Sequence, residues 1–323
     1  MRVLITGGAG FIGSHLVDAL LEEGHEPYVA DNLVSGSRAN LPSEVPLFEV
    51  DVCDRDALAK VFHEIQPQSV SHQAAQMSVS RSVRDPVFDA EVNVLGLLNV
   101  FELAVQTGSA RIVFASSGGV LYGDVEEPAT EQAPCEPVSP YGISKWVGEQ
   151  YLKFFVREHG IQGVALRYAN VYGPRQNPHG EAGVVAIFSR KMLAGEQATV
   201  NGDGLYFRDY VYVTDVARAN VMALTIDPAE SFVALNIGTG LRVDVNELAA
   251  AVRERCQTVR GEAADVPQPS HGDARAGDLR SSVVSAAKAH QLLGWEPRVD
   301  LASGLRQTVD WFAARKDDAK TPT

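Results

Sequence analysis

Tyr141 and Lys145 lie four residues apart in Tyr-Gly-Ile-Ser-Lys, at the start of a segment with helical spacing. Residues at positions i and i+4 share one face of a helix, so the phenol and the ammonium are expected side by side. A free Tyr phenol has a pKa of about 10, and a neighbouring positive charge favours its phenolate form. The spacing predicts that Tyr141 is a base that removes a hydroxyl proton, with Lys145 lowering its pKa.

Two serines, Ser116 and Ser117, end an apolar run of the kind that forms a buried strand. Ligands of doubly wound sheets bind beyond the carboxyl ends of the strands. Ser117 is therefore predicted to be a catalytic hydroxyl that hydrogen-bonds the reacting oxygen, and Ser116 is a second candidate for contact with the substrate. The alternative is that both belong to an ordinary turn, because Gly118 and Gly119 follow them.

Three glycines with equal spacing, Gly7, Gly10 and Gly13, lie between an apolar run and a helical pattern. The first permits a tight turn, the second lets the backbone approach a pyrophosphate, and the third lets the helix pack close to the strand. The first helical turn, which includes Phe11 and Ile12, presents free N–H groups to phosphate. These positions predict a dinucleotide site.

Acidic residues follow the second and third predicted strands. Asp31 ends the second strand, where its carboxylate can accept hydrogen bonds from ribose hydroxyls and repel a 2′-phosphate, which favours NAD over NADP. Arg38 leaves NADP open, because a nearby Arg can accept that phosphate. Asp51 and Val52 end the third strand and are candidates for contact with the adenine edge, although Asp51 can instead cap the next helix.

These residues need a regular framework to position them, and the first half of the chain has one. Apolar runs over 3–5, 27–30, 47–50, 70–72, 111–115 and 164–167 alternate with helical patterns over 13–23, 54–65, 87–105 and 141–159. This rhythm predicts an α/β fold with a doubly wound, Rossmann-type parallel sheet. We expect a dinucleotide-binding domain over 1–169 with a return segment near 234–238. A smaller, partly interleaved α/β region over 170–323 would bind the substrate.

The composition narrows the classes of partner. The 323-residue chain has a formal net charge of −13, which argues against nucleic acid, and no apolar stretch is long enough to span a membrane. The three cysteines are widely spaced and the histidines lack metal-ligand spacing, so we expect reduced thiols, a cytoplasmic location and no metal.

Together these motifs resemble the extended short-chain dehydrogenase/reductase family, and within it the NAD-dependent nucleotide-sugar 4-epimerases. The resemblance runs from Met1 to about Trp311. Besides the glycine turn and the Tyr/Lys pair it includes Asp31-Asn32-Leu33, His72-Gln73-Ala74-Ala75, Asn93-Val94-Leu95-Gly96, Asn170-Val171-Tyr172-Gly173-Pro174, Arg208-Asp209-Tyr210-Val211-Tyr212-Val213 and Leu292-Leu293-Gly294-Trp295-x-Pro297.

The family implies roles at matching positions. Residues that would line NAD are Asn32, Ala74, Ala75 and Asn93. Residues that would bind a UDP-sugar are Asn170, Arg208, Arg275 and Asp278, with the arginines on phosphate and the aspartate on a ribose hydroxyl. The family also suggests a homodimer that is joined through the helices over 87–105 and 141–159.

The family further suggests which reaction follows oxidation at C4 of the sugar. Its dehydratases place an Asp-Glu pair, and its decarboxylases a Glu, directly after the catalytic hydroxyl, where this chain has Gly118-Gly119. We therefore expect re-reduction of a transient 4-keto sugar, which is epimerisation of a UDP-hexose such as UDP-glucose or UDP-galactose. Ser282 falls where the family gates the space beside C2, and its small size predicts room for N-acetylated substrates. UDP-glucuronate 4-epimerisation or decarboxylation, or an NAD-binding sensor without turnover, are the alternatives.

Overall fold

The computed structural model describes residues 1–178, 183–226, 230–261, 264–274 and 278–315. Its main sheet contains seven strands, whose order is β11-β6-β5-β4-β1-β2-β3 and whose pairings are all parallel. They are β1 (Arg2–Thr6), β2 (Glu26–Asp31), β3 (Leu47–Glu49), β4 (Ser69–His72), β5 (Arg111–Ser117), β6 (Gln162–Tyr168) and β11 (Phe232–Ile237). The predicted doubly wound parallel sheet is confirmed. The strand order reverses between β1 and β4, where such sheets open a crevice for ligands.

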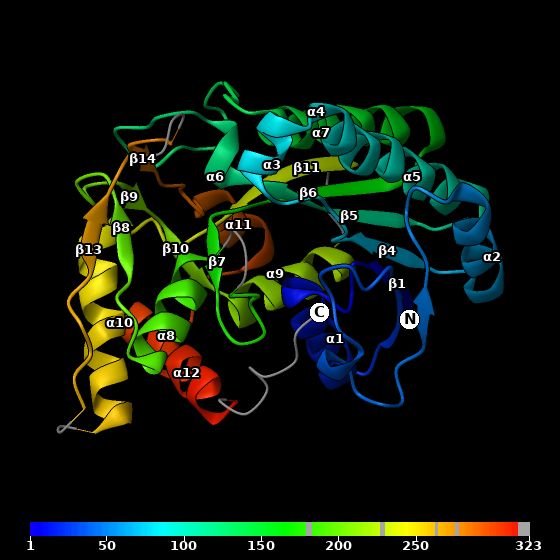
Figure 1. The fold of residues 1–323 in the computed structure, drawn as a ribbon. Helices are drawn as coiled ribbons and strands as arrows, with labels where there is room; N and C mark the ends of the chain where they lie inside the picture. The colour runs from blue at the N-terminus through cyan, green and yellow to red at the C-terminus, as the bar shows by residue number, and fades with distance from the viewer. Residues whose placement is uncertain (179–182, 227–229, 262–263, 275–277, 316–323) are drawn as a thin grey trace.

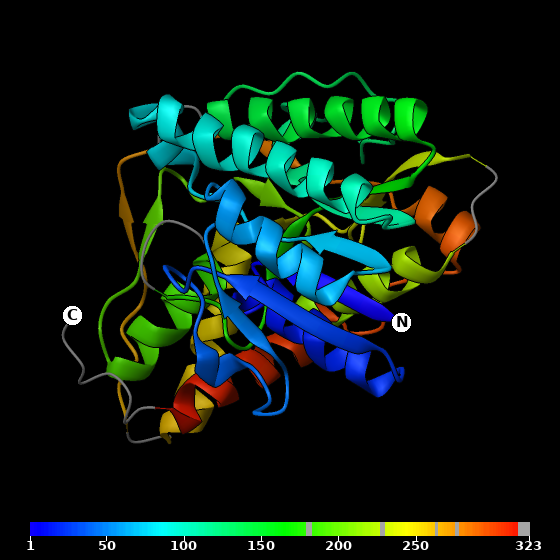
Figure 2. The same cartoon turned by 90° about the vertical axis from the view of Figure 1, so that its right-hand side faces the viewer.

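Helices cover both faces of this sheet (Figures 1 and 2). Helices α1 (Phe11–Glu22) and α9 (Val213–Thr225) lie on one face, and α2 (Arg55–Ile65), α5 (Leu97–Gln106) and α7 (Pro140–His159) lie on the other. Apolar side chains meet the sheet on each side, such as Leu16 and Leu20 of α1 and Leu152 of α7. Each fully buried aliphatic side chain of this kind contributes about 1.5–3 kcal/mol.

The single long helix that we predicted over 87–105 is interrupted. The segment begins as α4 (Pro86–Ala90), continues as the π-helical stretch η2 (Glu91–Gly96), and only then becomes α5. Gly96, the last residue of this stretch, packs closely on Val52, because a Cβ on it would lie 2.8 Å from Val52 Cγ2. Single turns of π-helix are rare and are frequent at functional sites. Here the stretch carries Asn93, one of the candidate cofactor residues.

A smaller region follows β6. Its helices are α8 (Val184–Ala194), α10 (Val245–Arg260) and α12 (Leu301–Ala314), which share a third apolar core. Its short strands are β7 (Asn170–Tyr172), β8 (Thr199–Asn201), β9 (Phe207–Arg208), β10 (Tyr210–Tyr212), β12 (Val243–Asp244), β13 (Ser270–Gly272) and β14 (Ser281–Ser282). Between them the chain returns to the main sheet as β11, which pairs with β6. The division at residue 169 stays a prediction.

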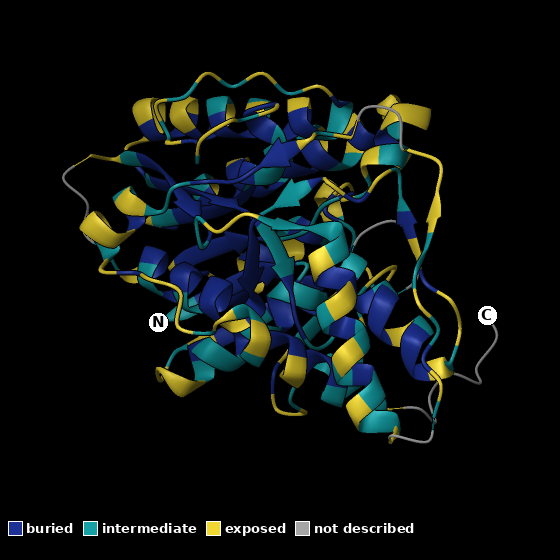
Figure 3. Ribbon diagram, turned by 90° about the vertical axis from the view of Figure 1, so that its left-hand side faces the viewer, coloured by how far each residue is buried: buried dark blue, intermediate teal, exposed yellow. Residues whose placement is uncertain are grey.

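The remaining helices are short: η1 (Arg38–Asn40), α3 (Val79–Arg84), α6 (Gly118–Leu121) and α11 (Ala287–Leu293). Exposed and buried residues alternate along the outer helices, as expected for single layers that cover a sheet (Figure 3). Within the described residues we find no helix long and apolar enough to cross a membrane, and no group of three or more His, Cys, Asp or Glu side chains placed to hold a metal ion.

Candidate active site

The carboxyl end of β5 and the first turns of α7 bring the predicted catalytic residues together. Helix α7 begins at Pro140, and the Ser139 side chain caps it by accepting a hydrogen bond from the backbone of Gly142. Lys145 is buried, and its Nζ donates to the carbonyl oxygen of Ala115 in β5 at 2.9 Å. Ser117, the last residue of β5, lies close enough to Tyr141 for its hydroxyl to favour the phenolate form. The helix and the strand therefore hold a phenol, a hydroxyl and an ammonium at one sheet edge.

Burial governs the acidities of this group. It raises the pKa of Tyr141 above its ordinary value, the charge of Asp89 acts in the same direction, and the Ser117 hydroxyl acts in the opposite one. Burial also lowers the pKa of Lys145 to about 8, against an opposing effect of Asp89. We expected Lys145 to lower the pKa of Tyr141, and that effect stays a prediction, because the causes that raise this pKa are burial and Asp89. Lys145 Nζ lies 5.7 Å from the centre of the Tyr141 ring, and it donates to a backbone carbonyl.

The two neighbouring serines point to different places. Successive side chains of a strand face opposite sides of the sheet. Ser116 is buried, and its hydroxyl donates to Glu149 Oε1 at 2.6 Å, so the structure does not bring Ser116 into the site as we expected. Ser117 is half-buried and is the serine that reaches Tyr141.

The turn from Gly7 to Gly13, between β1 and α1, is so tightly packed that its glycines have no room for side chains, and we call it the glycine cradle. Gly7 has φ +69°, and a Cβ on it would lie 2.6 Å from the backbone nitrogen of Ala74. A Cβ on Gly13 would lie 2.2 Å from the carbonyl oxygen of Gly7. Helix α1 begins at Phe11 without a side-chain cap, so the N–H groups of its first turn, at Phe11 and Ile12, face the turn without such a partner. Free helical N–H groups beside a compact glycine turn fit a dinucleotide pyrophosphate.

Asp31 lies next to this cradle. Its carboxylate accepts hydrogen bonds from the backbone nitrogens of Ala9 at 2.9 Å and Leu33 at 2.8 Å. Burial raises its pKa, and these hydrogen bonds oppose the rise. Arg38 was the residue that could have bound the 2′-phosphate of NADP. Its guanidinium instead donates hydrogen bonds to the carbonyl oxygens of Pro42, Ser43 and Val45. The arrangement fits a ribose diol better than a ribose 2′-phosphate.

The neighbouring pair Asp51 and Asn32 is joined by a hydrogen bond of 2.8 Å between the Asn32 amide and Asp51 Oδ2. Burial raises the pKa of Asp51, but hydrogen bonds from the Cys53 backbone and from Asn32 outweigh it and lower the pKa. Asp51 does not cap the following helix, since Asp54 accepts the capping hydrogen bond. Val52 is buried, with its carbonyl oxygen bound by Asn99.

Asn93 takes a different place from the one we expected. Its amide is bound within the protein: it donates to Gln76 O, Asp89 Oδ1 and Ser144 Oγ and accepts from the backbone of Gln76. Asp89 is almost fully buried and also accepts from the Gln76 side chain at 2.8 Å. Asn93 therefore links the segment after β4 to α7. Ala74 and Ala75, in the same segment, are partly exposed beside the glycine turn.

The substrate candidates gather on the other side of Ser117. The guanidinium of Arg208 forms an ion pair with Asp278, 70 residues away in sequence, and both lie near β14. Ser282 is buried and donates to the Gly119 carbonyl oxygen at 3.1 Å. A Cβ on Gly119 would lie 3.8 Å from Ser117 Oγ and 3.9 Å from Ser282 Oγ, so small residues separate the two hydroxyls.

Two further substrate candidates need separate mention. Asn170 begins β7, and its Nδ2 is buried without a hydrogen-bond partner among the described residues, which fits an amide that a ligand would satisfy. Arg275 lies outside the described residues.

Sequence reasoning assigned no role to three buried acids near the site, which are Asp89, already described, Glu149 and Asp209. Asp209 follows Arg208 and accepts hydrogen bonds from Thr239, Gly240 and Val284, which ties the end of β9 to the segments after β11 and β14. Burial raises its pKa, and these bonds oppose the rise. Glu149 lies four residues after Lys145, so the rule that paired Tyr141 with Lys145 would have found it. No comparable spacing marks Asp209.

Comparisons with known proteins agree with this geometry. The model of the NAD-dependent epimerase/dehydratase family matches residues 3–238. The UDP-glucose 4-epimerase of Mycolicibacterium smegmatis is 43% identical over 318 residues, which is 97% of this chain and 98% of that protein. A crystal structure of Thermotoga maritima UDP-glucose 4-epimerase with UDP-glucose is 45% identical with a TM-score of 0.90, covering 97% of this chain and 99% of that one. The Thermus thermophilus UDP-glucose 4-epimerase in complex with NAD is 47% identical with a TM-score of 0.90, covering 98% and 100%.

Proposed function

The chain belongs to the NAD-dependent epimerase/dehydratase family, and from this premise we propose that it inverts C4 of a UDP-hexose, interconverting UDP-glucose and UDP-galactose. The observation that carries the proposal is the grouping of Ser117, Tyr141 and Lys145 at the end of β5. The glycine cradle after β1 adds a place for NAD at the same edge of the sheet. Similarity to UDP-glucose 4-epimerases over nearly the full chain supports the substrate class.

NAD would be held by the chain's own backbone and acids. The turn over Gly7, Gly10 and Gly13 with the first turn of α1 would bind the pyrophosphate, and Asp31 would bind the adenosine ribose. Asn32, Asp51 and Val52 would border the adenine, and Ala74 and Ala75 would face the middle of the cofactor. Glycines suit this turn because a Cβ at Gly7 or Gly13 would clash with backbone atoms. The turn would therefore bind the pyrophosphate through backbone N–H groups.

When bound, the oxidised nicotinamide ring supplies a two-electron acceptor for the sugar carbon and a positive charge that lowers the pKa of Tyr141. Tyr141 takes the proton of the C4 hydroxyl and returns a proton when the ketone is reduced. Ser117 hydrogen-bonds both Tyr141 and the reacting oxygen. Lys145 keeps a positive charge close to the phenol and is fixed on Ala115, which stabilises the deprotonated form.

The residues after Ser117 support epimerisation over elimination or decarboxylation. Gly118 and Gly119 open α6 directly beyond the catalytic hydroxyl, and neither offers an acid or a base. Neither glycine could therefore help a 4-keto sugar to lose water or carbon dioxide. Re-reduction of the ketone, which gives epimerisation, is the outcome that this loop favours. Asn170, Arg208, Arg275 and Asp278 would hold the UDP-sugar, the arginines on its phosphates.

The sugar side of the site supports a broader substrate range. Gly119 and Ser282, which lie between the Ser117 hydroxyl and β14, carry little or no side chain, and we infer from their small size a gap beside the sugar. We propose that this gap accepts the N-acetyl group of UDP-N-acetylhexosamines as well as a C2 hydroxyl. Activity on the UDP-N-acetylglucosamine and UDP-N-acetylgalactosamine pair tests the idea, and complete inertness toward both would refute it.

A surface of helices α4, η2 and α7 supports a homodimer. Large apolar side chains lie exposed there, and we call them the apolar helix face: Val87, Leu95, Ile143, Trp146 and Phe154. Helices α4 and α7 lie side by side in both views of the fold (Figures 1 and 2). Two copies that pair through this face would bury the exposed rings and aliphatic chains in a bundle. We propose such a cytoplasmic homodimer.

Product analysis tests the proposed reaction. Purified protein is incubated with UDP-galactose, and separately with UDP-glucuronate, in heavy water. We expect UDP-glucose of unchanged mass, because epimerisation adds and removes no atoms and the hydrogen at C4 is not exchanged with solvent. A product that has lost carbon dioxide would indicate decarboxylation instead. Absence of any product from either sugar nucleotide, with NAD added, would refute the assignment as an enzyme.

A further inference from the structure

A buried ion pair lies beneath the candidate active site, between α7 and β6. Arg167 Nη2 lies 2.7 Å from Glu149 Oε2, and Arg167 Nε donates to Glu149 Oε1 at 2.9 Å. The two side chains are only 6% and 0% exposed. The proposed reaction uses neither of them.

The carboxylate of Glu149 connects the two elements that carry the catalytic residues. Glu149 follows Lys145 by one helical step of four residues, and Tyr141 by two, so all three share a face of α7. On the strand side, Ser116 donates to Glu149 Oε1 at 2.6 Å, and Ser116 directly precedes Ser117. One carboxylate therefore fixes the end of β5 against the helix that holds Tyr141.

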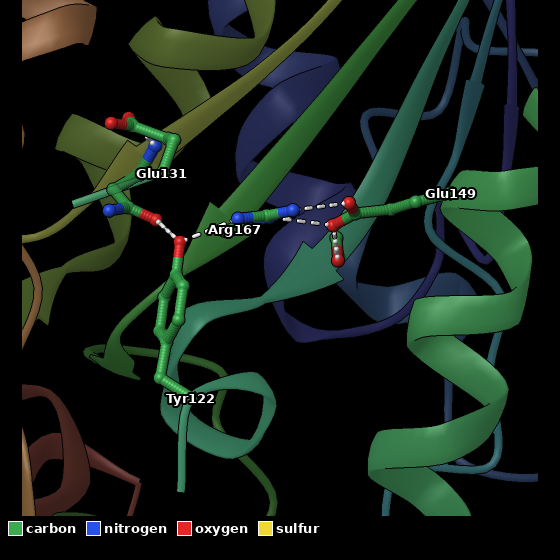
Figure 4. Close-up of polar contacts among 6 residues, drawn as sticks. Tyr122, Glu131, Glu149 and Arg167 are labelled. Carbon is green, nitrogen blue, oxygen red and sulfur yellow. Dashed lines mark hydrogen bonds and ion pairs between the residues drawn. The ribbon is translucent and has the colours of Figure 1, made fainter. Parts of the chain in front are cut away.

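Arg167 extends this connection to the opposite side (Figure 4). Its Nη1 donates to the Tyr122 hydroxyl at 2.7 Å, and that hydroxyl donates to Asn236 Oδ1 in β11 at 2.7 Å. The backbone nitrogen of Asn236 in turn donates to Glu131. The hydrogen bonds tie β5, β6, β11 and the segment after α6 into one buried network around the ion pair.

The energetics suggest that this network serves more than stability. Removing two charges from water costs about as much as their attraction returns, and well-packed apolar replacements of buried ion pairs are often neutral or stabilising. What a bidentate, fully hydrogen-bonded pair adds is a fixed geometry. The geometry held here is that of Ser117 relative to Tyr141.

We propose that Glu149 is a positioning residue, which acts through Ser116 to hold the Ser117 hydroxyl on Tyr141, with Arg167 fixing its orientation. The inference rests on the proposed function, because it assigns Glu149 to the placement of that reaction's hydroxyl. A positioning role of Glu149 predicts a result that a purely structural role does not. Loss of Glu149 should lower turnover only as long as Ser117 is present.

A double-mutant cycle between Glu149→Gln and Ser117→Ala tests this coupling. The Gln variant is isosteric; it removes the charge and replaces one acceptor oxygen by an NH2 group, which cannot accept a hydrogen bond from Ser116 or Arg167. In the otherwise unchanged protein we expect it to lower kcat roughly tenfold and to change KM for UDP-galactose less than about threefold, since a small displacement of a catalytic group lowers the rate without removing substrate contacts. In the Ser117→Ala background the same change should lower kcat less than about threefold.

Two further variants keep the test independent of folding. Arg167→Lys keeps the pair of charges but loses the bidentate contact, and should show the same pattern with a smaller loss of kcat. Asp310→Asn breaks the ion pair with Arg255 between α10 and α12, which is partly exposed, and should leave kcat unchanged. Circular dichroism and thermal melting establish that each variant is folded at the assay temperature.

Equal losses of kcat from Glu149→Gln with and without Ser117 would overturn the proposal, as would full turnover of both Glu149→Gln and Arg167→Lys. Failure of the proposed function gives a different result, because the unchanged protein would then not convert UDP-galactose at all. Should Glu149→Gln not fold, the cycle between Arg167→Lys and Ser117→Ala decides by the same criterion.

Discussion

Replacing Tyr141 by Phe removes one hydroxyl from the group at the end of β5 and leaves the ring in place. General acid–base catalysis by a positioned side chain typically contributes about 10²–10⁴-fold. We therefore expect kcat for UDP-galactose to fall by that factor, which corresponds to about 3–5 kcal/mol of lost transition-state stabilisation. Substrate binding should change little, because no phosphate or uridine contact is removed.

The structure separates this loss from an effect on folding. Tyr141→Phe removes the interaction of the phenol with the Ser117 hydroxyl, and even a complete hydrogen bond there would contribute only about 1 kcal/mol to stability. For a chain of this size the Tm should then move by no more than about 4 °C. The loss of turnover would thus greatly exceed the loss of stability, as expected when the hydroxyl takes part in the chemistry.

The assay follows UDP-glucose formation with a coupling dehydrogenase at saturating UDP-galactose. Tyr151→Phe is the matched control, since Tyr151 lies on the same helix and is 37% exposed. It should keep full kcat. A Tyr141→Phe variant that retains more than about a tenth of kcat, or a Tyr151→Phe variant that loses as much, would refute the assignment of Tyr141 as the base.

Four other predictions follow from single contacts. Gly13→Ala places a Cβ 2.2 Å from the Gly7 carbonyl oxygen, so it should weaken NAD binding at least about tenfold in calorimetric titration, and unchanged affinity would contradict the cradle. Burial lowers the pKa of Lys145 from 10.5 to about 8, so between these two pH values the unfolded chain binds more protons than the folded one and the free energy of unfolding should rise with pH. Measured by urea unfolding, the free energy of unfolding of the unchanged protein should rise by about 2 kcal/mol more than that of Lys145→Met between pH 7.5 and 9.5. The same pH dependence in both proteins would disprove this prediction. Ser282→Tyr should abolish turnover of UDP-N-acetylhexosamines while retaining that of UDP-galactose, and equal losses on both pairs would argue against the gap. Trp146→Glu on the apolar helix face should convert a dimer to a monomer in light scattering, whereas a monomeric unchanged protein would rule that interface out.

Local patterns in the sequence determined much of the framework. The alternation of apolar runs with helical spacing was sufficient for the parallel sheet, because both periodicities are properties of short segments. The glycine turn and the Tyr141/Lys145 pair were visible for the same reason. Their chemistry depends on residues that are close in the chain, within one turn or one helical repeat.

Tertiary structure decided which groups are available. Ser116 and Ser117 are equivalent in sequence, and only the packing of α7 on β5 commits one to Glu149 and leaves the other at Tyr141. The place of Asn93 in a π-helical stretch, and the binding of its amide by Gln76 and Asp89, likewise arise only in the folded chain.

The contacts that sequence reasoning missed join residues far apart in the chain. Arg208 meets Asp278, and Glu149 meets Arg167, across distances in sequence that no periodicity encodes. The acidity of Tyr141 also depends on such packing, because burial and the charge of Asp89 raise its pKa. Identity and spacing of residues determined which chemistry this chain could carry out, while desolvation and long-range contacts, which arise only when the segments pack, decided which atoms are free to take part.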